Sequence, residues 1–295
     1  MPRRFLKLRE KGIELLLLLS ALSSVLITLS IVFVLCYEAF AFFKDVPLWE
    51  FLTGREWMPL FAQPSFGILP LVSGTLLVTG IAVAVALPIG LIVAIYLSEY
   101  APFRVKEIAK PVLELLAAVP TVVYGYFALL FLTPILQEVI PNLSGFNALS
   151  PGIIMGIMII PYVSSVSEDA MKAVPMQIRE GSYAMGATKF QTAFKVVIPS
   201  AFSGIAAAFV IGVSRAIGET MVVAIAAGMM PNLTINPIEP VQTLTAYIVG
   251  VSLGDLPHGT IEYKTIFAAG ITLFAMTLGL NILGFWFRRR IREVY

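Results

Sequence analysis

The chain has 295 residues, of which 58% are apolar and only 13% are charged, and its mean hydropathy is +0.90. A water-soluble domain cannot bury that much hydrocarbon, so the composition excludes a soluble enzyme and indicates that lipid is the main solvent. The formal net charge is +2. With one cysteine and one histidine, the sequence excludes an intramolecular disulfide and a multi-histidine or cysteine-based metal site.

Six stretches are long and apolar enough to cross a bilayer as helices, which takes about 20 residues each. In chain order they cover approximately Ile13–Tyr37, Ile68–Leu97, Val112–Phe131, Pro151–Val166, Ala201–Met230 and Thr265–Phe287. The first apolar run is too long for a signal-peptide core, which spans about 7–15 residues, so it is expected to remain as an anchor. Pro120 is expected to kink the third span. The pattern predicts an all-α, polytopic membrane protein with six transmembrane helices.

The basic residues between these spans predict the orientation of the chain. The segments on the side of the N-terminus contain 16 Lys and Arg residues, whereas the segments on the other side contain three. By the positive-inside rule, both termini are expected in the cytoplasm. The loops expected outside are Lys44–Phe66, Leu132–Ser150 and Pro231–Lys264.

The expected domain organisation has two parts. Residues 1–66 form an N-terminal tail, the first transmembrane helix and the first extracytoplasmic loop. Residues 67–295 form the transport domain, with a polar cytoplasmic segment at about 168–199 that is too long for a simple turn and is therefore expected to have a function.

Within this cytoplasmic segment stands Glu180-Gly-Ser-Tyr-Ala-Met-Gly186, followed by Ile198-Pro199. It resembles the EAA-type signature of ABC importer permeases, in which a short helix couples the permease to its ATPase. The resemblance implies coupling roles for Glu180, Gly181, Ser182, Gly186, Ala187 and Pro199. An apolar anchor is expected from Met176, Ile178, Tyr183 and Met185, and Gly186 permits a sharp turn. The alternative is an amphipathic helix that lies on the lipid headgroups.

Three further blocks resemble the PstC-type permease subunit of the phosphate ABC importer. They run Phe66–Thr75, Lys110–Gly125 and Ser214–Thr220. The resemblance covers nearly the whole chain and implies the type I ABC importer (MetI-like) permease fold. It also implies a second, homologous PstA-like permease, a cytoplasmic PstB-like ATPase dimer and an extracytoplasmic PstS-like phosphate-binding protein.

The candidate substrate pathway consists of Arg215, Glu219 and Glu114. An arginine in mid-membrane costs at least about 2.5 kcal/mol, so Arg215 is expected to face protein or a water-filled path. A guanidinium fits phosphate oxygens bidentately, and Glu219, four residues later, is expected within ion-pair reach on the same helix face. The alternative is a structural Arg–Glu pair. Glu114 lies near the start of its expected span and is the weakest of the three candidates.

No catalytic constellation, metal site, nucleic-acid-binding signal or ATP-binding P-loop is expected from the sequence, which contains no Gly-Lys dipeptide. The chain is therefore interpreted as a transport subunit without cofactor, with ATP hydrolysis on a separate subunit. Alternatives are a permease for sulfate or molybdate, an ATP-independent secondary transporter, for which no internal repeat is visible, and a channel, for which no filter motif is visible.

Overall fold

The computed structural model describes the backbone of residues 3–290 and the side chains of residues 10–286. Regular structure in this part of the chain is helical, apart from the isolated bridges Trp57–Phe66 and Gly228–Val241. The long helices are α1 (Arg3–Phe43), α3 (Leu69–Ile95), α7 (Leu149–Lys172) and α14 (Ile261–Arg290). The shorter ones are α2 (Leu48–Thr53), α4 (Phe103–Ala118), α5 (Thr121–Phe127), α6 (Thr133–Val139), α8 (Met176–Ala184), α9 (Lys189–Thr192), α10 (Ile198–Ser200), α11 (Phe202–Ile217), α12 (Met221–Ala226) and α13 (Leu244–Ser252). Three π-helical segments join neighbours: η1 (Tyr96–Tyr100), η2 (Ala128–Leu132) and η3 (Ala193–Val197).

Each of the six expected spans has a helical counterpart. Five helices of the described chain are long and apolar enough to cross a membrane, and a bent pair of helices supplies a sixth if it is counted as one span. The five are Glu10–Phe43, Leu69–Tyr100, Thr121–Val139, Leu149–Lys172 and Ile261–Trp286, and the pair is Lys189–Ser200 with Phe202–Ile217. The all-α prediction is confirmed.

The third span lies later in the chain than the sequence predicts. The backbone leaves the helical region at Val119 (φ −62°, ψ 130°), so α4 ends there and α5 starts after Pro120. Proline disfavours a helical conformation in the residue before it and has no N–H to donate, which explains the break. The apolar stretch that can span a membrane is therefore Thr121–Val139 rather than Val112–Phe131, and the loop expected at Leu132–Ser150 is correspondingly shorter.

The fifth span is also not the continuous helix that Ala201–Met230 predicts. The chain bends by 71° between α10 and α11, and α11 ends at Ile217. Gly218 follows as its C-cap, and α12 begins only at Met221. Glycine is a poor helix former, so the helix ends there, and Glu219 is not on α11.

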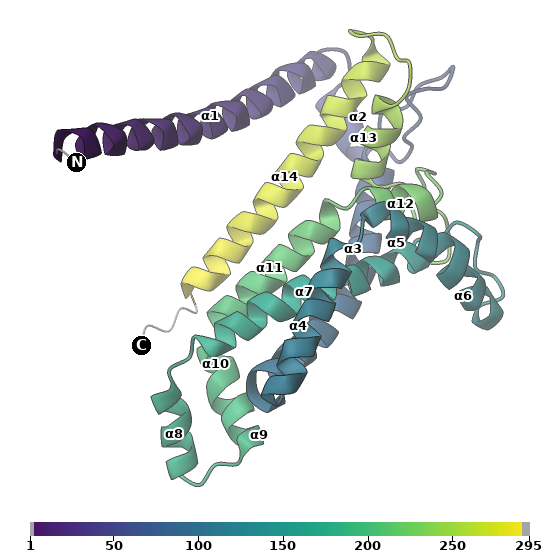
Figure 1. Cartoon of the computed structure of the whole chain (residues 1–295). Helices are drawn as coiled ribbons and strands as arrows, with labels where there is room; N and C mark the ends of the chain where they lie inside the picture. The colour runs from purple at the N-terminus through teal and green to yellow at the C-terminus, as the bar shows by residue number, and fades with distance from the viewer. Residues whose placement is uncertain (1–2, 291–295) are drawn as a thin grey trace.

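The core of the fold is α7, which packs between α3 and α11 (Figure 1). Val163 of α7 lies against both neighbours at once. A Cβ atom at Gly90 of α3 would lie 2.8 Å from one Val163 methyl carbon, and a Cβ at Gly212 of α11 would lie 2.9 Å from the other. Small residues recur every four positions along α11 and allow this close packing: Gly204, Ala208, Gly212 and Ala216.

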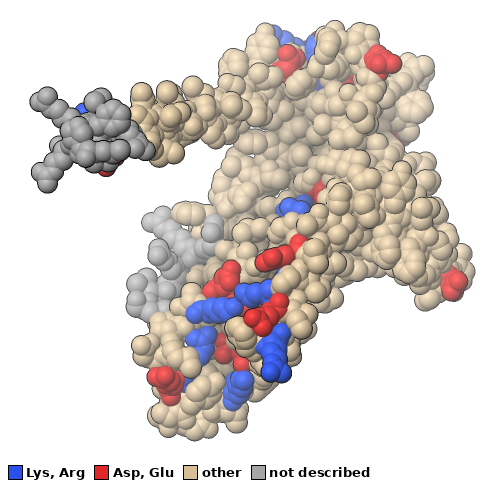
Figure 2. All heavy atoms as spheres, in the orientation of Figure 1, with Lys and Arg blue, Asp and Glu red and all other residues tan. Residues whose placement is uncertain are grey.

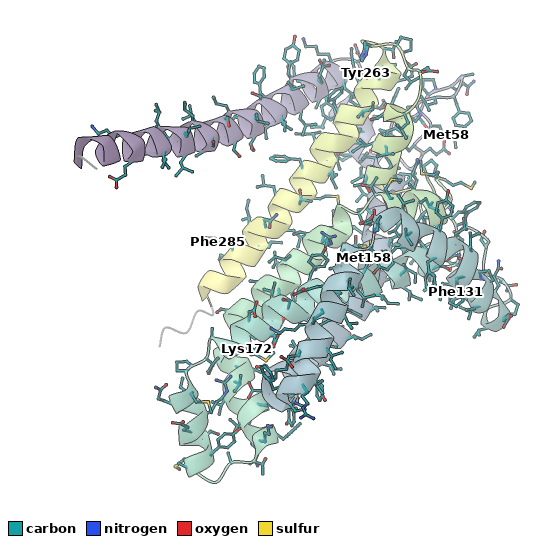
Figure 3. The ribbon with its side chains drawn as sticks, viewed as in Figure 1. Met58, Phe131, Met158, Lys172, Tyr263 and Phe285 are labelled. Carbon is teal, nitrogen blue, oxygen red and sulfur yellow. The ribbon has the colours of Figure 1, made fainter. Side chains whose placement is uncertain are left out.

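The two ends of the bundle differ in composition. Figure 3 shows Met58 and Tyr263 at one end, and Lys172 at the other. At the first end, α2 and the following loop form an aromatic cluster around Trp57, which is 1% exposed and packs edge-on against Tyr247 of α13. The first and third loops expected outside thus contain helices with buried residues, α2 and α13. The C-terminal part of α1 packs near α14, whereas the N-terminal part of the helix extends away from the body (Figure 1).

Candidate functional site

The segment with the Glu180–Gly186 motif forms a helical hairpin at one end of the molecule. Helix α8 ends at Ala184, and Gly186 has a φ of +81°, a conformation that favours glycine, so the predicted sharp turn is confirmed. The next helix starts with a capping box. Thr188 Oγ1 accepts a hydrogen bond from the Gln191 N–H, and Gln191 Oε1 accepts one from the Thr188 N–H. The motif therefore encodes a defined turn.

The hairpin exposes several large apolar side chains. Met185 is 88% exposed, and Met176 and Tyr183 are also exposed, as an apolar anchor for a partner requires. Ile178 differs from the prediction, because it packs inward against the cluster around Met171. Two further exposed rings lie on this hairpin and were not expected from the sequence, Phe190 and Phe194, whose centroids are 4.4 Å apart.

The other members of the motif have distinct surroundings. Glu180 is exposed, and a Cβ at Gly181 would meet no atom within 4 Å. Ser182 Oγ hydrogen-bonds to Thr192 Oγ1 at 2.9 Å and so joins the two arms of the hairpin. Ala187 is half-buried beside the turn. Pro199 is exposed in α10, two residues before the bend at Ala201.

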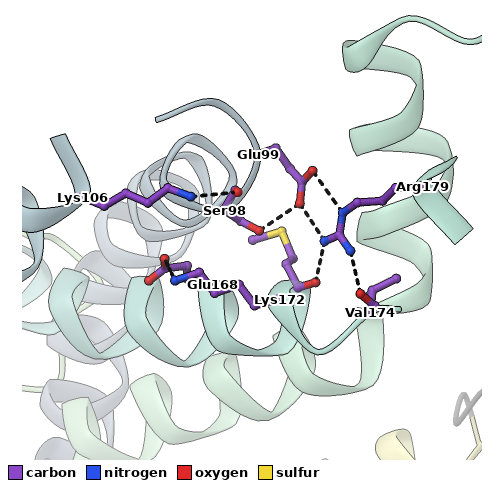
Figure 4. Close-up of polar contacts among 8 residues, drawn as sticks. Ser98, Glu99, Lys106, Glu168, Lys172, Val174 and Arg179 are labelled. Carbon is purple, nitrogen blue, oxygen red and sulfur yellow. Dashed lines mark hydrogen bonds and ion pairs between the residues drawn. The ribbon is translucent and has the colours of Figure 1, made fainter. Parts of the chain in front are cut away.

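An ion pair fixes α8 to η1, the π-helical segment that continues α3 (Figure 4). Arg179 Nη2 lies 2.9 Å from Glu99 Oε1, and its Nε donates to Glu99 Oε2 at 3.4 Å. The same guanidinium donates to the carbonyl oxygens of Val174 and Met171, at 2.6 Å and 2.8 Å. Arg179 therefore binds η1 and the C-terminal end of α7 together. This arginine directly precedes Glu180 of the motif and was not among the residues expected from the sequence.

A second group of charges connects α4 and α7. Glu168 is 1% exposed and forms ion pairs with Lys172, one turn later on α7, and with Lys110 of α4 at 3.1 Å. Figure 2 shows that Lys, Arg, Asp and Glu gather around this end of the molecule, while most of the visible middle is uncharged. This distribution agrees with the uneven distribution of Lys and Arg along the sequence.

A cavity of about 430 Å³ lies between α4 and α7. Its lining includes Lys110, Glu114, Tyr162 and Glu168. Glu114 is exposed and belongs to α4, outside the helix stretch that can span a membrane, so its expected place near the start of the third span is wrong. Glu114 nevertheless shares the lining of this cavity with Tyr162 and Glu168 of α7.

Arg215 is half-buried on α11, and its Nε is buried without a hydrogen-bond partner. Its guanidinium carbon lies 4.0 Å from the centre of the Tyr162 ring, well within the range of a cation–π contact. Among residues 10–286, no carboxylate forms an ion pair with Arg215. The predicted Arg215–Glu219 ion pair is therefore wrong. Its guanidinium is held against an aromatic face and keeps its polar edge free of acidic partners.

Glu219 is 8% exposed and has a different set of contacts. Its Oε1 accepts hydrogen bonds from the backbone N–H groups of Met221 and Val222, at 3.1 Å and 3.4 Å, at the start of α12. Its own carbonyl oxygen accepts a bond from Thr245 of α13. A carboxylate at a helix start satisfies N–H groups that have no partner in the helix, so Glu219 stabilises the break between α11 and α12. No group of three metal-ligating side chains was found among the described residues.

Comparisons with known proteins agree with this architecture. A family described as "Binding-protein-dependent transport system inner membrane component" matches residues 86–293. The chain is 37% identical over 228 residues to the "Probable ABC transporter permease protein YqgH" of Bacillus subtilis, which covers 77% of this chain and 74% of the relative. It is 31% identical over 251 residues to the "Probable phosphate transport system permease protein PstC" of Methanocaldococcus jannaschii, with 79% and 78% covered.

Solved structures share the fold at low sequence identity. A chain of a bacterial alginate ABC transporter, in complex with an alginate pentasaccharide-bound periplasmic protein, aligns with a TM-score of 0.66 and 17% identity, over 97% of this chain and 98% of that one. A chain of the MetNI methionine ABC transporter, in an inward-facing conformation, aligns with a TM-score of 0.56 and 16% identity, over 77% and 95%. The predicted MetI-like permease fold is confirmed.

Proposed function

Because the chain belongs to the family of binding-protein-dependent transport system inner membrane components, we propose that it is the PstC-like permease subunit of an ATP-driven phosphate importer. The chain is a multi-pass membrane protein and a permease of the type I ABC importer family. Phosphate as the substrate is supported by the relatives named as phosphate permeases, including those of Methanocaldococcus jannaschii and Xylella fastidiosa. Sulfate or molybdate is the alternative cargo.

The single observation that carries the anion assignment is the environment of Arg215. Among the described residues, the Arg215 guanidinium has a buried Nε without a hydrogen-bond partner and forms no ion pair, so no carboxylate of this chain occupies its donors. A carboxylate would compete with an anion for these donors, whereas an aromatic face leaves the in-plane N–H groups available. Arg215 would then bind phosphate oxygens, Glu219 would hold the break that follows α11, and Glu114 would line the cavity between α4 and α7.

The proposed partners follow from the assignment as a PstC-like permease subunit. The hairpin surface of Met176, Tyr183 and Met185, on the motif Glu180–Gly186, would dock on a cytoplasmic PstB-like ATPase dimer. A PstA-like second permease would complete the translocation path. A PstS-like binding protein would deliver phosphate at the end of the bundle that contains Trp57, which we assign to the outside. Both termini would lie in the cytoplasm, and the complex would lie in the inner membrane of the cell.

In this proposal, residues 67–295 are the transport domain, and residues 1–66 add a helix and an outside loop. ATP binding would close the ATPase subunits, the hairpin would transmit this movement, and the two permeases would alternate access. Membership of a binding-protein-dependent family leaves an ATP-independent transporter or a channel without support. The chain itself performs no bond chemistry.

The test is ATP-dependent phosphate uptake by the complete complex in proteoliposomes, measured per assembled complex. Arg215→Gln should lower uptake by roughly 10- to 150-fold, the worth of one charged hydrogen bond, without loss of assembly, since no carboxylate is left unpaired. Arg215→Lys should retain part of the activity, because it keeps the charge without the planar fork. Wild-type uptake by Arg215→Gln would refute the pathway role. Uptake of sulfate in place of phosphate by the unmodified complex would refute the assigned cargo alone.

A further inference from the structure

The contact between Arg215 and Tyr162 joins two helices that meet in the core, α11 and α7. The guanidinium carbon of Arg215 lies over the ring of Tyr162, 4.0 Å from the ring centroid. The five N–H donors of a guanidinium lie in its plane, so a ring on the face does not occupy them. This is the geometry that orients the fork of an arginine and still leaves it able to bind an oxyanion at its edge.

Tyr162 also has a second partner. Its hydroxyl donates to the carbonyl oxygen of Ala117, at 3.3 Å, in the last turn of α4. The carbonyl groups of a last turn have no partner within the helix, and Pro120 cannot continue α4. Tyr124 of α5 contributes the same kind of bond, from its hydroxyl to the carbonyl oxygen of Leu116 at 2.7 Å.

The two tyrosines share one kind of bond but differ in their relation to Arg215. Both hydroxyls donate to carbonyl groups at the end of α4, but of the two rings only that of Tyr162 forms a cation–π contact with Arg215. Tyr162 also lines the cavity between α4 and α7, together with Glu114. Tyr162 therefore contacts the arginine, lines the cavity and bonds to the end of α4, next to the break between α4 and α5.

We propose that Tyr162 is a positioning residue of the anion site, whose ring fixes the orientation of the Arg215 guanidinium and whose hydroxyl ties that orientation to the end of α4. This inference rests on the proposed role of Arg215 in binding the anion. Tyr162 acts through Arg215 and does not itself bind the anion. The predicted consequence is that loss of the ring matters only while an arginine is present to be oriented.

A double-mutant cycle on the complete complex tests this, with phosphate uptake per assembled complex as the readout. Tyr162→Leu should lower uptake by roughly 3- to 30-fold, the range of a cation–π contact that is shielded from water. In an Arg215→Gln background, which has no cation for the ring to hold, the same change should lower the residual uptake by less than about twofold. Tyr162→Met, which fills the space without a ring, provides the same comparison if leucine impairs assembly.

Two controls separate the ring from the hydroxyl. Tyr162→Phe keeps the ring but loses the bond to Ala117, so it should lower uptake less than Tyr162→Leu does. Tyr124→Phe removes a comparable hydroxyl bond from a ring that forms no cation–π contact with Arg215, and it should lower uptake no more than Tyr162→Phe does. A merely structural role would give equal losses for Tyr162→Leu in both backgrounds, and that result would overturn the inference. So would wild-type uptake by Tyr162→Leu in a complex that Arg215→Gln inactivates, and the role of Arg215 would then stand. Wild-type uptake by Arg215→Gln would instead remove the proposed function.

Discussion

Replacing Glu99 by glutamine removes the charge opposite Arg179 with little change in side-chain volume. The two side chains are only 7% and 11% exposed, so the ion pair is largely shielded from solvent. A hydrogen bond between charged groups contributes about 1.5–3 kcal/mol, and breaking a buried pair costs about 3–5 kcal/mol. Arg179 keeps its bonds to the carbonyl groups of Met171 and Val174, which compensate part of the loss. We therefore expect α8 to lose about 2–3 kcal/mol of local stability, or roughly 30- to 150-fold in its opening equilibrium.

The measurement is hydrogen–deuterium exchange of the α8 amides, residues 176–184, in the purified complex. Glu99→Gln should reduce their protection and leave the amides of α14 unchanged. The matched control is Asp45→Asn, which breaks the ion pair of Asp45 with Lys264 at 2.9 Å. Since the Asp45 side chain is 47% exposed, this change should cost less than about 1 kcal/mol and should not affect α8.

Unchanged protection of α8 in Glu99→Gln would refute the conclusion that this pair holds the helix in place. An equal loss of protection in Asp45→Asn would show that α8 responds to any weakening of the fold, and the specific role of the buried pair would be lost as well.

Further predictions concern the hairpin and the orientation of the chain. Gly186→Val should abolish stimulation of the ATPase, since a branched residue is strained at a φ of +81°. The control Gly181→Ala should preserve the hairpin, because a Cβ there meets no atom within 4 Å. Normal stimulation of the ATPase by Gly186→Val would contradict the role of the turn. In a Cys36→Ser background, Leu60→Cys should react with an impermeant thiol reagent added to intact cells, and Met185→Cys should not. The reverse pattern would contradict both the orientation and the docking of the hairpin.

The features that the sequence predicts correctly are local ones. The existence of six apolar stretches, though not the bounds of the third and fifth, and the turn at Gly186 depend on the composition of a short window or on one residue, so the sequence contains their cause. The packing of α11 on α7 follows from a repeat of small residues at helical spacing. Each of these needs no knowledge of distant parts of the chain.

The features that the sequence analysis misses depend on contacts between distant residues or on a helix end. Glu99 and Arg179 are 80 residues apart, and nothing in either neighbourhood identifies the other as a partner. The ring of Tyr162 under Arg215 is also distant in sequence, 53 residues before it. The predicted Arg215–Glu219 pair is wrong because it assumes that the helix continues through Gly218, whereas the backbone turns and Glu219 accepts bonds from N–H groups of α12 instead.

The interlocking of α7 with its neighbours gives the fold a mechanical property. Helix α7 has 24 residues, so at 1.5 Å per residue it is about 36 Å long. Arg179 binds α8 to its end, and Val163 is wedged between glycines of α3 and α11, so the four helices would move as one stiff lever. A tilt of about 10° would then displace the far end of a rod of this length by roughly 6 Å. In the proposed mechanism, a movement of the hairpin would thus reach the opposite end of α7 as a displacement wider than a water molecule.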